Sequence, residues 1–382
     1  MKKSLMIVAG EVSGDMLAAR LVSALKEQAP EVECWGIGGP RLRACGMQTY
    51  YDVREMAVMG LSEVLRRYFF FRRVFYEMIR LAEEKKPDAV LLVDYPGFNV
   101  RLAEQLHRRG IKTLYYISPQ VWAWHRSRIP KLAAILDRLM VIFPFEVDVF
   151  SGTGLAVDFV GHPLVVEAEK ARREPLLELP WTSGRRVALL PGSRRHEVSR
   201  ILPCLLEAAV LLEKQNPDVC FILAAPSEEI RDVAEQVMAR QTVRPAQVAI
   251  VVDQTRQVLR QARAAMVASG TATIEATLQH CPMIVVYKTA WPTYLMARWL
   301  VRGVKHIGMV NVVAGRLVCP EFIQHQAQPE AMAAQMIPLL DDSPERAAML
   351  NGLNEVCDAL SVSGHSSQAA ELVLRELTAD RP

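Results

Sequence analysis

The sequence of 382 residues has few of the features that mark membrane-spanning, disulfide-rich or metal-binding proteins. No stretch approaches the roughly 18–20 apolar residues that a membrane-spanning helix needs. The seven cysteines are scattered, odd in number and form no C-x-x-C pair, which argues against a disulfide framework and a cysteine zinc site. The eight histidines show no H-x-x-x-H spacing, so no metal is implied. We expect a cytoplasmic protein that is soluble or lies on a membrane without crossing it.

The sequence also lacks a strong excess of charge. Its 45 basic and 42 acidic residues give a net charge of +3, which is too small to indicate a nucleic-acid partner. Two lysines before an apolar run resemble the start of a signal peptide, but Glu11 and Asp15 interrupt the run too early. The chain does contain 51% hydrophobic residues, and its length suits two domains of ordinary size.

Short apolar runs alternate with amphipathic stretches of helical length. Strands are expected at 4–10, 32–38, 87–96, 112–119, 138–144 and 157–163, and in a second series at 186–191, 219–226, 247–252, 264–269 and 283–288. Expected helices include 16–28, 61–85 and 99–110, and helices dominate after 328. This alternation predicts two α/β domains with parallel sheets, at 1–164 and 187–360. The charged, proline-containing segment 165–186 is interpreted as a linker.

The turns that follow the strands are the candidate binding sites, because ligands of open parallel sheets bind beyond the carboxyl ends of the strands. The first such turn, AGEVSGD (9–15), has Gly10 and Gly14, and its backbone amides can bind an anion or hydroxyls. The alternative is that its glycines serve packing and Asp15 complements the helix end. No G-x-G-x-x-G motif occurs in the chain, which disfavours a dinucleotide-binding fold.

The turn VDYPGFN (93–99) places Asp94 directly after an apolar strand. A carboxylate that is desolvated on one side has a raised pKa, which suits a general base. The alternative is an aspartate that caps the helix beginning near Asn99. Pro96 and Gly97 intervene and make that geometry awkward, so a functional role is favoured.

Two turns of the second series resemble phosphate sites. In LLPGSRR (189–195), Gly192, Ser193 and Arg194 lie between a strand and a helix, where an anion can dock. The alternative is a glycine turn with a serine cap and solvated arginines. In ASGTATIEAT (268–277) the candidate residues are Ser269, Gly270, Thr271 and Thr273. Glu275 either complements the helix dipole or accepts hydrogen bonds from a ribose. Together the two turns make a diphosphate plausible.

Two further stretches combine aromatic and basic residues. In SPQVWAWHRSRIPKL (118–132), Trp122 and Arg126 are candidates for sugar stacking and phosphate binding, or belong to a helix with a solvated basic face. The second stretch, LRRYFFFRRVFYEMIR (65–80), resembles an interfacial membrane helix, and a core-facing helix with a basic outer side is the alternative. Three consecutive phenylalanines cannot all face one core, which favours the membrane. Its candidate membrane-contact residues are Tyr68, Phe69, Phe70, Phe71, Arg72 and Arg73.

Taken together, these stretches resemble the lipid-A-disaccharide synthase family. The resemblance is carried in order along nearly the whole chain by AGEVSGD, GGPRLRACG, MAVMGLSEVL, VDYPGFN, PQVWAWHRSRIPKL, FPFEVDVF, FVGHPL, LLPGSR, ASGTATIEATL and NVVAGRLVCPEFIQ. It implies a GT-B fold, in which two Rossmann-like domains face each other across a cleft. It also implies that a C-terminal helix, at 361–382, crosses back to the N-terminal domain.

The resemblance implies an inverting glycosyltransferase. UDP-2,3-diacylglucosamine would donate its sugar to the 6-hydroxyl of 2,3-diacylglucosamine 1-phosphate, giving a β-1,6 disaccharide 1-phosphate and UDP. The protein would bind peripherally to the cytoplasmic face of the inner membrane, and a homo-oligomer is possible. No metal or other cofactor is implied, and the chain has no D-x-D motif.

The same resemblance assigns roles to individual residues. Asp94 would be the catalytic base, and Arg194 would stabilise the leaving diphosphate. Asn311 would contact substrate and is grouped with the donor-binding turns. Acceptor binding is expected at Glu11, Ser13, Gly14, Trp122 and Arg126. Glu11 competes with Asp94 for the role of base.

The sequence is compatible with two other functions. A UDP-N-acetylglucosamine 2-epimerase of the same build would also bind UDP, but would need no apolar helix. A non-catalytic lipid-binding protein would need only an apolar surface, and would leave the phosphate-type turns and Asp94 without a purpose.

Overall fold

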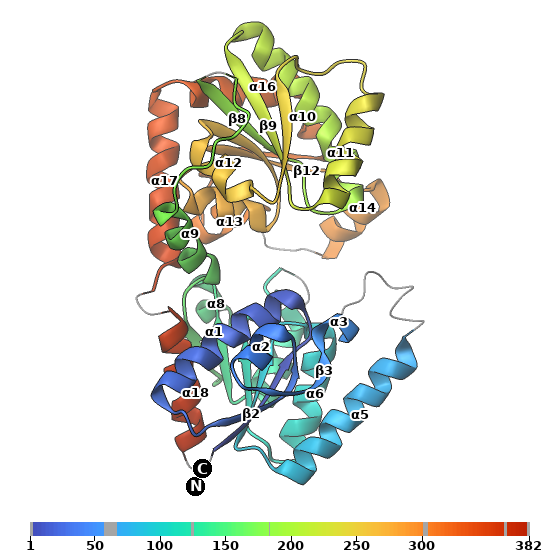
Figure 1. Cartoon of the computed structure of the whole chain (residues 1–382), viewed down its shortest axis with the longest axis vertical. Helices are drawn as coiled ribbons and strands as arrows, with labels where there is room; N and C mark the ends of the chain where they lie inside the picture. The colour runs from blue at the N-terminus through green and yellow to red at the C-terminus, as the bar shows by residue number, and fades with distance from the viewer. Residues whose placement is uncertain are drawn as a thin grey trace. The chain divides into compact units, whose positions relative to one another are not determined.

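The computed structural model describes residues 3–56, 67–123, 126–182, 184–300, 305–362 and 365–379, and the chain forms two compact units (Figure 1). The first unit comprises Met1–Pro163 and Val362–Pro382, and the second comprises Leu164–Ser361. Each unit is built around one parallel sheet.

The first unit has a seven-stranded sheet with the order β3-β2-β1-β4-β5-β6-β7. Its elements are β1 Ser4–Ala9, α1 Val12–Gln28, β2 Glu33–Gly38, α2 Pro40–Ala44, β3 Gln48–Asp52, α3 Val53–Met56, α5 Tyr68–Lys85, β4 Ala89–Val93, α6 Pro96–Arg108, β5 Thr113–Tyr116, η1 Arg126–Arg128, α7 Ile129–Ile135, β6 Arg138–Val141, α8 Phe145–Val149, β7 Ala156–Phe159 and α18 His365–Thr378.

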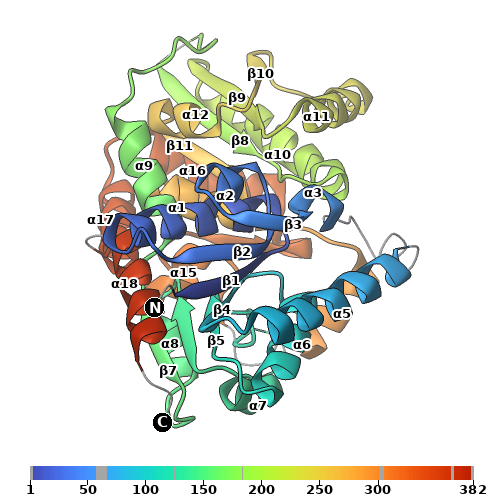
Figure 2. The same ribbon diagram turned by 60° about the horizontal axis from the view of Figure 1, so that its bottom comes forward.

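Helices cover both faces of this sheet, as the alternating strands and helices predict. Along β1, Leu5 and Ile7 face a core shared with α1 and α18, whereas Met6 and Val8 face a core shared with α5 and α6. Figure 2 shows α1 and α2 on one side of the sheet and α5, α6 and α7 on the other. Both faces are buried, which is why the strands read as continuous apolar runs.

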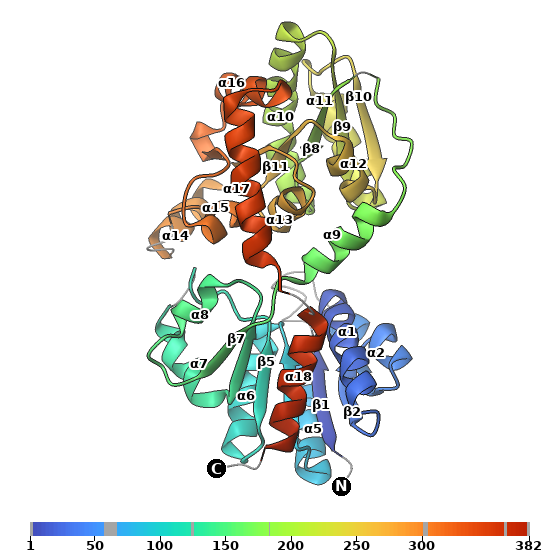
Figure 3. The same ribbon diagram turned by 90° about the vertical axis from the view of Figure 1, so that its left-hand side faces the viewer.

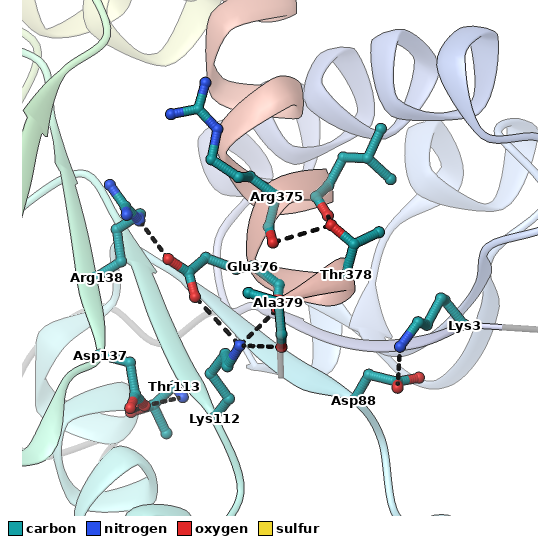
Figure 4. Close-up of polar contacts among 11 residues, drawn as sticks. Lys3, Asp88, Lys112, Thr113, Asp137, Arg138, Arg375, Glu376, Thr378 and Ala379 are labelled. Carbon is teal, nitrogen blue, oxygen red and sulfur yellow. Dashed lines mark hydrogen bonds and ion pairs between the residues drawn. The ribbon is translucent and has the colours of Figure 1, made fainter. Parts of the chain in front are cut away.

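The C-terminal helix α18 belongs to the first unit, where it packs beside α1 (Figure 3). Its apolar side chains join the core of that face. At its end the buried ammonium of Lys112 donates to the backbone carbonyl of Glu376 at 2.6 Å, and Arg138 Nε donates to the Glu376 carboxylate at 2.8 Å (Figure 4). The return of this helix to the N-terminal unit is therefore confirmed.

The second unit has a six-stranded sheet with the order β10-β9-β8-β11-β12-β13. Its elements are α9 Pro163–Arg173, β8 Arg185–Leu190, α10 Arg195–Gln215, β9 Val219–Ala225, α11 Glu228–Arg240, β10 Val248–Val252, α12 Thr255–Gln261, β11 Ala264–Ala268, α13 Thr271–Leu278, β12 Met283–Tyr287, α14 Trp291–Leu300, α15 Met309–Ala314, β13 Glu321–Ile323, η2 Gln324–Gln326, α16 Pro329–Leu340 and α17 Pro344–Leu360.

The segment expected as a linker, 165–186, differs from that expectation because its first half is helix α9. The charged side chains of α9 bind the second unit: Arg256 Nη1 lies 3.0 Å from the Glu167 carboxylate, and Arg172 donates to the carbonyl of Leu278 at 2.6 Å. Charges that suggest a solvated linker in the sequence are thus paired within a folded unit.

Candidate functional site

Each sheet has one point where the strand order reverses, and the loops on its two sides diverge there. In the first unit this switch point lies between β1 and β4, whose ends Ala9 and Val93 are neighbours in register. In the second unit it lies between β8 and β11. Ligands of such sheets bind at the switch point, beyond the carboxyl ends of the strands. The turns at 10–15, 94–99, 191–194 and 269–273 lie at these two points.

Asp94 is held in an unusual backbone conformation at the first switch point. Its φ angle is 47°, in the left-handed region that non-glycine residues rarely adopt. Its backbone carbonyl accepts from the Tyr115 hydroxyl and from Asn99 Nδ2, each at 2.7 Å, which fixes the turn. Burial raises the pKa of the Asp94 carboxyl, and the Tyr95 backbone N–H lowers it by less. A half-buried carboxylate with a raised pKa in a fixed position can take a proton.

The turn after β1 lies against the Asp94 turn. A Cβ at Gly10 would stand 2.2 Å from the Tyr95 ring, so glycine is required for this close approach. Burial and the charge of Asp94 raise the pKa of Glu11. Glu11 is therefore an electrostatic neighbour of Asp94. Ser13 is exposed in the same turn, and Gly14 is buried in the first turn of α1.

Asp15 in this motif has a structural role. The sequence suggested only that its charge complements the helix end. Its carboxylate is buried and accepts from the backbone N–H groups of Gly39, Arg41 and Leu42, at 2.6, 3.1 and 3.2 Å. It thus satisfies the otherwise unpaired amides at the start of α2.

Trp122 does not match its predicted role in stacking on a sugar. Its side chain is buried and packs edge-on against Phe145, with ring centroids 5.0 Å apart. The apolar ring has been drawn into the core of the unit, so it presents no face to a ligand. Arg126 is exposed in η1. The neighbouring Trp124 and His125 lie outside the described residues.

Glu146 is a buried carboxyl group that sequence reasoning left without a role. It lies in α8 at the carboxyl end of the first sheet, is 2% exposed, and accepts from the Phe143 backbone N–H at 3.2 Å. Burial raises its pKa to about 7, although the backbone amides of Phe143 and Ile142 favour its charged form. A lone glutamate within the apolar motif FPFEVDVF is the signal that points to it.

At the second switch point, Arg194 leaves an exposed guanidinium at the start of α10. Gly192 adopts a φ angle of 120°, and a Cβ there would approach Glu197 to 2.7 Å. The Glu197 carboxylate accepts from the backbone N–H groups of Ser193 and Arg194 at 3.2 and 3.3 Å, and from Arg194 Nη1 at 2.9 Å. These amides are therefore engaged by Glu197, and the Arg194 side chain is the group most open to an anion.

The turn after β11 places two of its four predicted residues in the open. Gly270 and Thr271 are exposed at the N-terminus of α13. Thr273 is fully buried, and its hydroxyl donates to the Gly270 carbonyl at 2.8 Å, so it shapes the turn instead of meeting a ligand. The Ser269 hydroxyl donates to the carbonyl of Ile307 at 2.9 Å. Glu275 is half-buried, and its pKa is raised by burial and lowered by less by Arg256.

Asn311 also differs from its predicted role as a substrate contact. Its side chain is fully buried, with Nδ2 donating to Cys319 O and the Glu321 carboxylate and Oδ1 accepting from the amides of Val318 and Cys319. All of its hydrogen-bonding capacity is used within the fold. Glu321, which the sequence did not single out, also accepts from the amides of Ile307 and Gly308. Asn311 and Glu321 therefore support the segment that Ser269 contacts.

The aromatic residues of α5 divide between the core and the surface. Phe70 and Phe71 are half-buried and pack against the core of the first unit. Successive residues of a helix are rotated by about 100° about its axis, which turns these two rings toward the core and Phe69 away from it. Phe69 is 77% exposed, Tyr68 54% and Tyr76 58%. Arg72 and Arg73 are exposed beside them. The apolar surface of α5 is thus smaller than the sequence suggested and excludes two of the three phenylalanines.

One cavity of the described structure lies away from these turns. A cavity of about 580 Å³ lies in the first unit beside Lys3, Asp88 and Lys112, at the amino ends of the strands and thus opposite the switch point. Among the described residues, no group of three or more His, Cys, Asp or Glu side chains is placed to hold a metal ion. Nor does any described helix combine the length and the apolar character needed to cross a bilayer.

Two solved structures share this arrangement of two sheets. A putative UDP-N-acetylglucosamine 2-epimerase from Listeria monocytogenes superposes with a TM-score of 0.65 at 14% identity, covering 100% of this chain and 99% of its own. The glycotransferase of kitacinnamycin superposes with a TM-score of 0.62 at 15% identity, covering 98% of each chain. The chain therefore has the GT-B fold, which glycosyltransferases and epimerases share.

Sequence comparison separates these two classes. The family model described as lipid-A-disaccharide synthetase matches residues 5–372. The lipid-A-disaccharide synthase of Anaeromyxobacter sp. (strain K) is 40% identical over 373 residues, which cover 97% of this chain and 96% of that protein. The chain belongs to the lipid-A-disaccharide synthase family of glycosyltransferases, and the epimerase alternative is not favoured.

Proposed function

We propose that the protein transfers 2,3-diacylglucosamine from UDP to the 6-hydroxyl of 2,3-diacylglucosamine 1-phosphate. The products are the β-1,6-linked disaccharide 1-phosphate and UDP. The observation that carries this proposal is Asp94: a carboxylate with a raised pKa, at the switch point of its sheet, held by Tyr115 and Asn99.

The chemistry divides between the two units. Asp94 takes the proton of the acceptor hydroxyl. At the same time the oxygen of that hydroxyl forms a bond to the anomeric carbon of the donor sugar. The bond from that carbon to the UDP oxygen breaks, and its electron pair goes to the diphosphate. The exposed guanidinium of Arg194 and the N-terminus of α13 at Gly270 and Thr271 stabilise this charge. Glu275, the fifth residue of α13, is half-buried and is the proposed acceptor for the ribose hydroxyls.

We further propose that the first unit binds the cytoplasmic face of the inner membrane through α5. The exposed rings of Tyr68, Phe69 and Tyr76 would enter the interface, while Arg72 and Arg73 would pair with anionic headgroups. Acceptor binding is proposed at Glu11, Ser13 and the Gly14 turn, and at Arg126.

One assay separates the possible functions. The protein is incubated with UDP-2,3-diacylglucosamine, with and without acceptor, and UDP release is followed. UDP release that depends on the acceptor supports the transferase. Conversion of the UDP-sugar to an epimer without acceptor would identify an epimerase, and no reaction in either mixture would identify a lipid-binding protein.

A further inference from the structure

Helix α14 of the second unit presents an apolar face that no part of the function described so far uses. Trp291 and Leu295 are each 58% exposed, and Trp299 is 68% exposed. These residues are four apart, so they lie on one face of the helix. Isolated exposed apolar residues are ordinary, but two tryptophans and a leucine in one row form a patch of the kind that binds a partner.

The sequence around this helix is strongly biased in charge. Between Glu275 and Glu321 the chain contains no acidic residue. The same stretch carries five cationic residues, Lys288, Arg298, Arg302, Lys305 and Arg316, of which Arg316 pairs with Glu355 at 2.5 Å. Lys305 is exposed shortly after the helix. A partner of this region is therefore expected to be both apolar and anionic.

The position of α14 in its unit connects it with the donor turn. Strand β12, which leads into α14, pairs in parallel with β11, so both strands end at the same edge of the sheet. The turn with Gly270 and Thr271 follows β11 at that edge. Figure 3 shows α14 at the periphery of the second unit, beside α15.

We propose that the Trp291–Leu295–Trp299 face of α14 docks on an anionic lipid bilayer, as a membrane contact of the second unit that is separate from α5. Tryptophan is enriched at membrane interfaces, and an amphipathic helix with neighbouring Lys and Arg lies in the plane of a bilayer that contains anionic lipids. The functional meaning rests on the proposed function: a donor whose acyl chains stay in the bilayer would meet its binding turn at the edge where α14 begins.

The test is cosedimentation of the full chain with vesicles of equal parts phosphatidylglycerol and phosphatidylcholine. The variant combines Trp291→Ser, Leu295→Ser and Trp299→Ser. The matched control combines Leu176→Ser, Leu177→Ser and Val243→Ser, which are also exposed apolar residues of the second unit. Both triple variants are made in the wild-type chain and in a chain that also carries Tyr68→Ser, Phe69→Ser and Tyr76→Ser, which removes the exposed rings of α5.

The partition coefficient of the α14 variant is expected to be at least about tenfold lower than that of its parent in either background. The reason is that removing one apolar side chain from the lipid lowers the partition coefficient by roughly that factor. The control is expected to bind like its parent. Wild-type binding is expected to weaken on vesicles of phosphatidylcholine alone. A well-folded α14 variant, checked by circular dichroism, that binds anionic vesicles like its parent would overturn the proposal.

Two further measurements keep the outcome decisive. Lipids with brominated acyl chains should quench wild-type tryptophan fluorescence, and the conservative Trp291→Phe, Trp299→Phe variant should lose most of this quenching. If sedimentation velocity shows that the wild type self-associates and the α14 variant is monomeric with unchanged vesicle binding, the face is a contact between copies and the proposal is wrong. Because these experiments measure binding, a protein that binds vesicles through α14 but releases no UDP would contradict only the proposed function.

Discussion

Replacing Glu146 by glutamine should change how the stability of the first unit depends on pH. The carboxyl group has a pKa of about 7 in the folded protein, against an ordinary value of 4.5, because it is buried. At about 1.4 kcal/mol for each pH unit between these values, ionisation of Glu146 costs the folded state about 3 kcal/mol. Between pH 4.5 and about 7 the folded state binds more protons than the unfolded state. This contribution to the free energy of unfolding therefore falls as pH rises through that window and is level above it.

Glutamine is neutral at every pH, so the Glu146→Gln variant should lack this decline. We expect it to match the wild type near pH 4.5 and to exceed it by up to about 3 kcal/mol above about pH 7. The assay is urea unfolding of both proteins at several pH values, with exposed Glu27→Gln as the control. Taking the difference between variant and wild type removes the titration of the groups that both proteins share. Parallel stability profiles for the two proteins would refute the reasoning.

Three other substitutions test separate parts of the structure. Asp15→Ala leaves buried amides at the start of α2 without an acceptor and should lower the free energy of unfolding by about 3 kcal/mol or more, and a loss within experimental error would contradict this role. Phe69→Ser should weaken binding to anionic vesicles without lowering the melting temperature, whereas Phe70→Ser should lower the melting temperature; the reverse pattern would show that their surroundings are misassigned. Arg194→Ala should reduce turnover by about 10²–10³-fold, with EDTA leaving the wild type unaffected, and magnesium-dependent recovery after EDTA would show that a metal carries the diphosphate charge.

Periodicity predicted most of the fold because most of its strands are central. Both faces of β1, β4, β8 and β11 are covered, so these strands are unbroken apolar runs bounded by turn residues. The strands that were missed, β3 and β13, lie at sheet edges. β3 contains QTYYD and is only half-buried, and β13 has three residues, so neither shows the signal of a central strand.

The place of a candidate residue in the fold was predictable where that residue directly follows a strand. Asp94 and Arg194 follow directly from strands that flank the switch points, and the structure leaves them accessible to a ligand. Trp122 and Asn311 have side chains that suit either a ligand or a core, and only tertiary packing decides between these environments. The partners that fix Asn311 and the 307–308 amides converge on Glu321, ten residues further along the chain, which no local pattern reveals.

The most direct test of the proposed mechanism is the turnover of Asp94→Asn, because asparagine keeps the shape of the side chain but cannot take a proton. We predict that the variant binds UDP-sugar as the wild type does and loses about 10²–10⁴-fold in acceptor-dependent UDP release. Because the pKa of Asp94 is raised, the acid limb of the wild-type rate profile should lie above the range of an ordinary aspartate. Normal turnover of Asp94→Asn together with an inactive Glu11→Gln variant would contradict the account and identify Glu11 as the base.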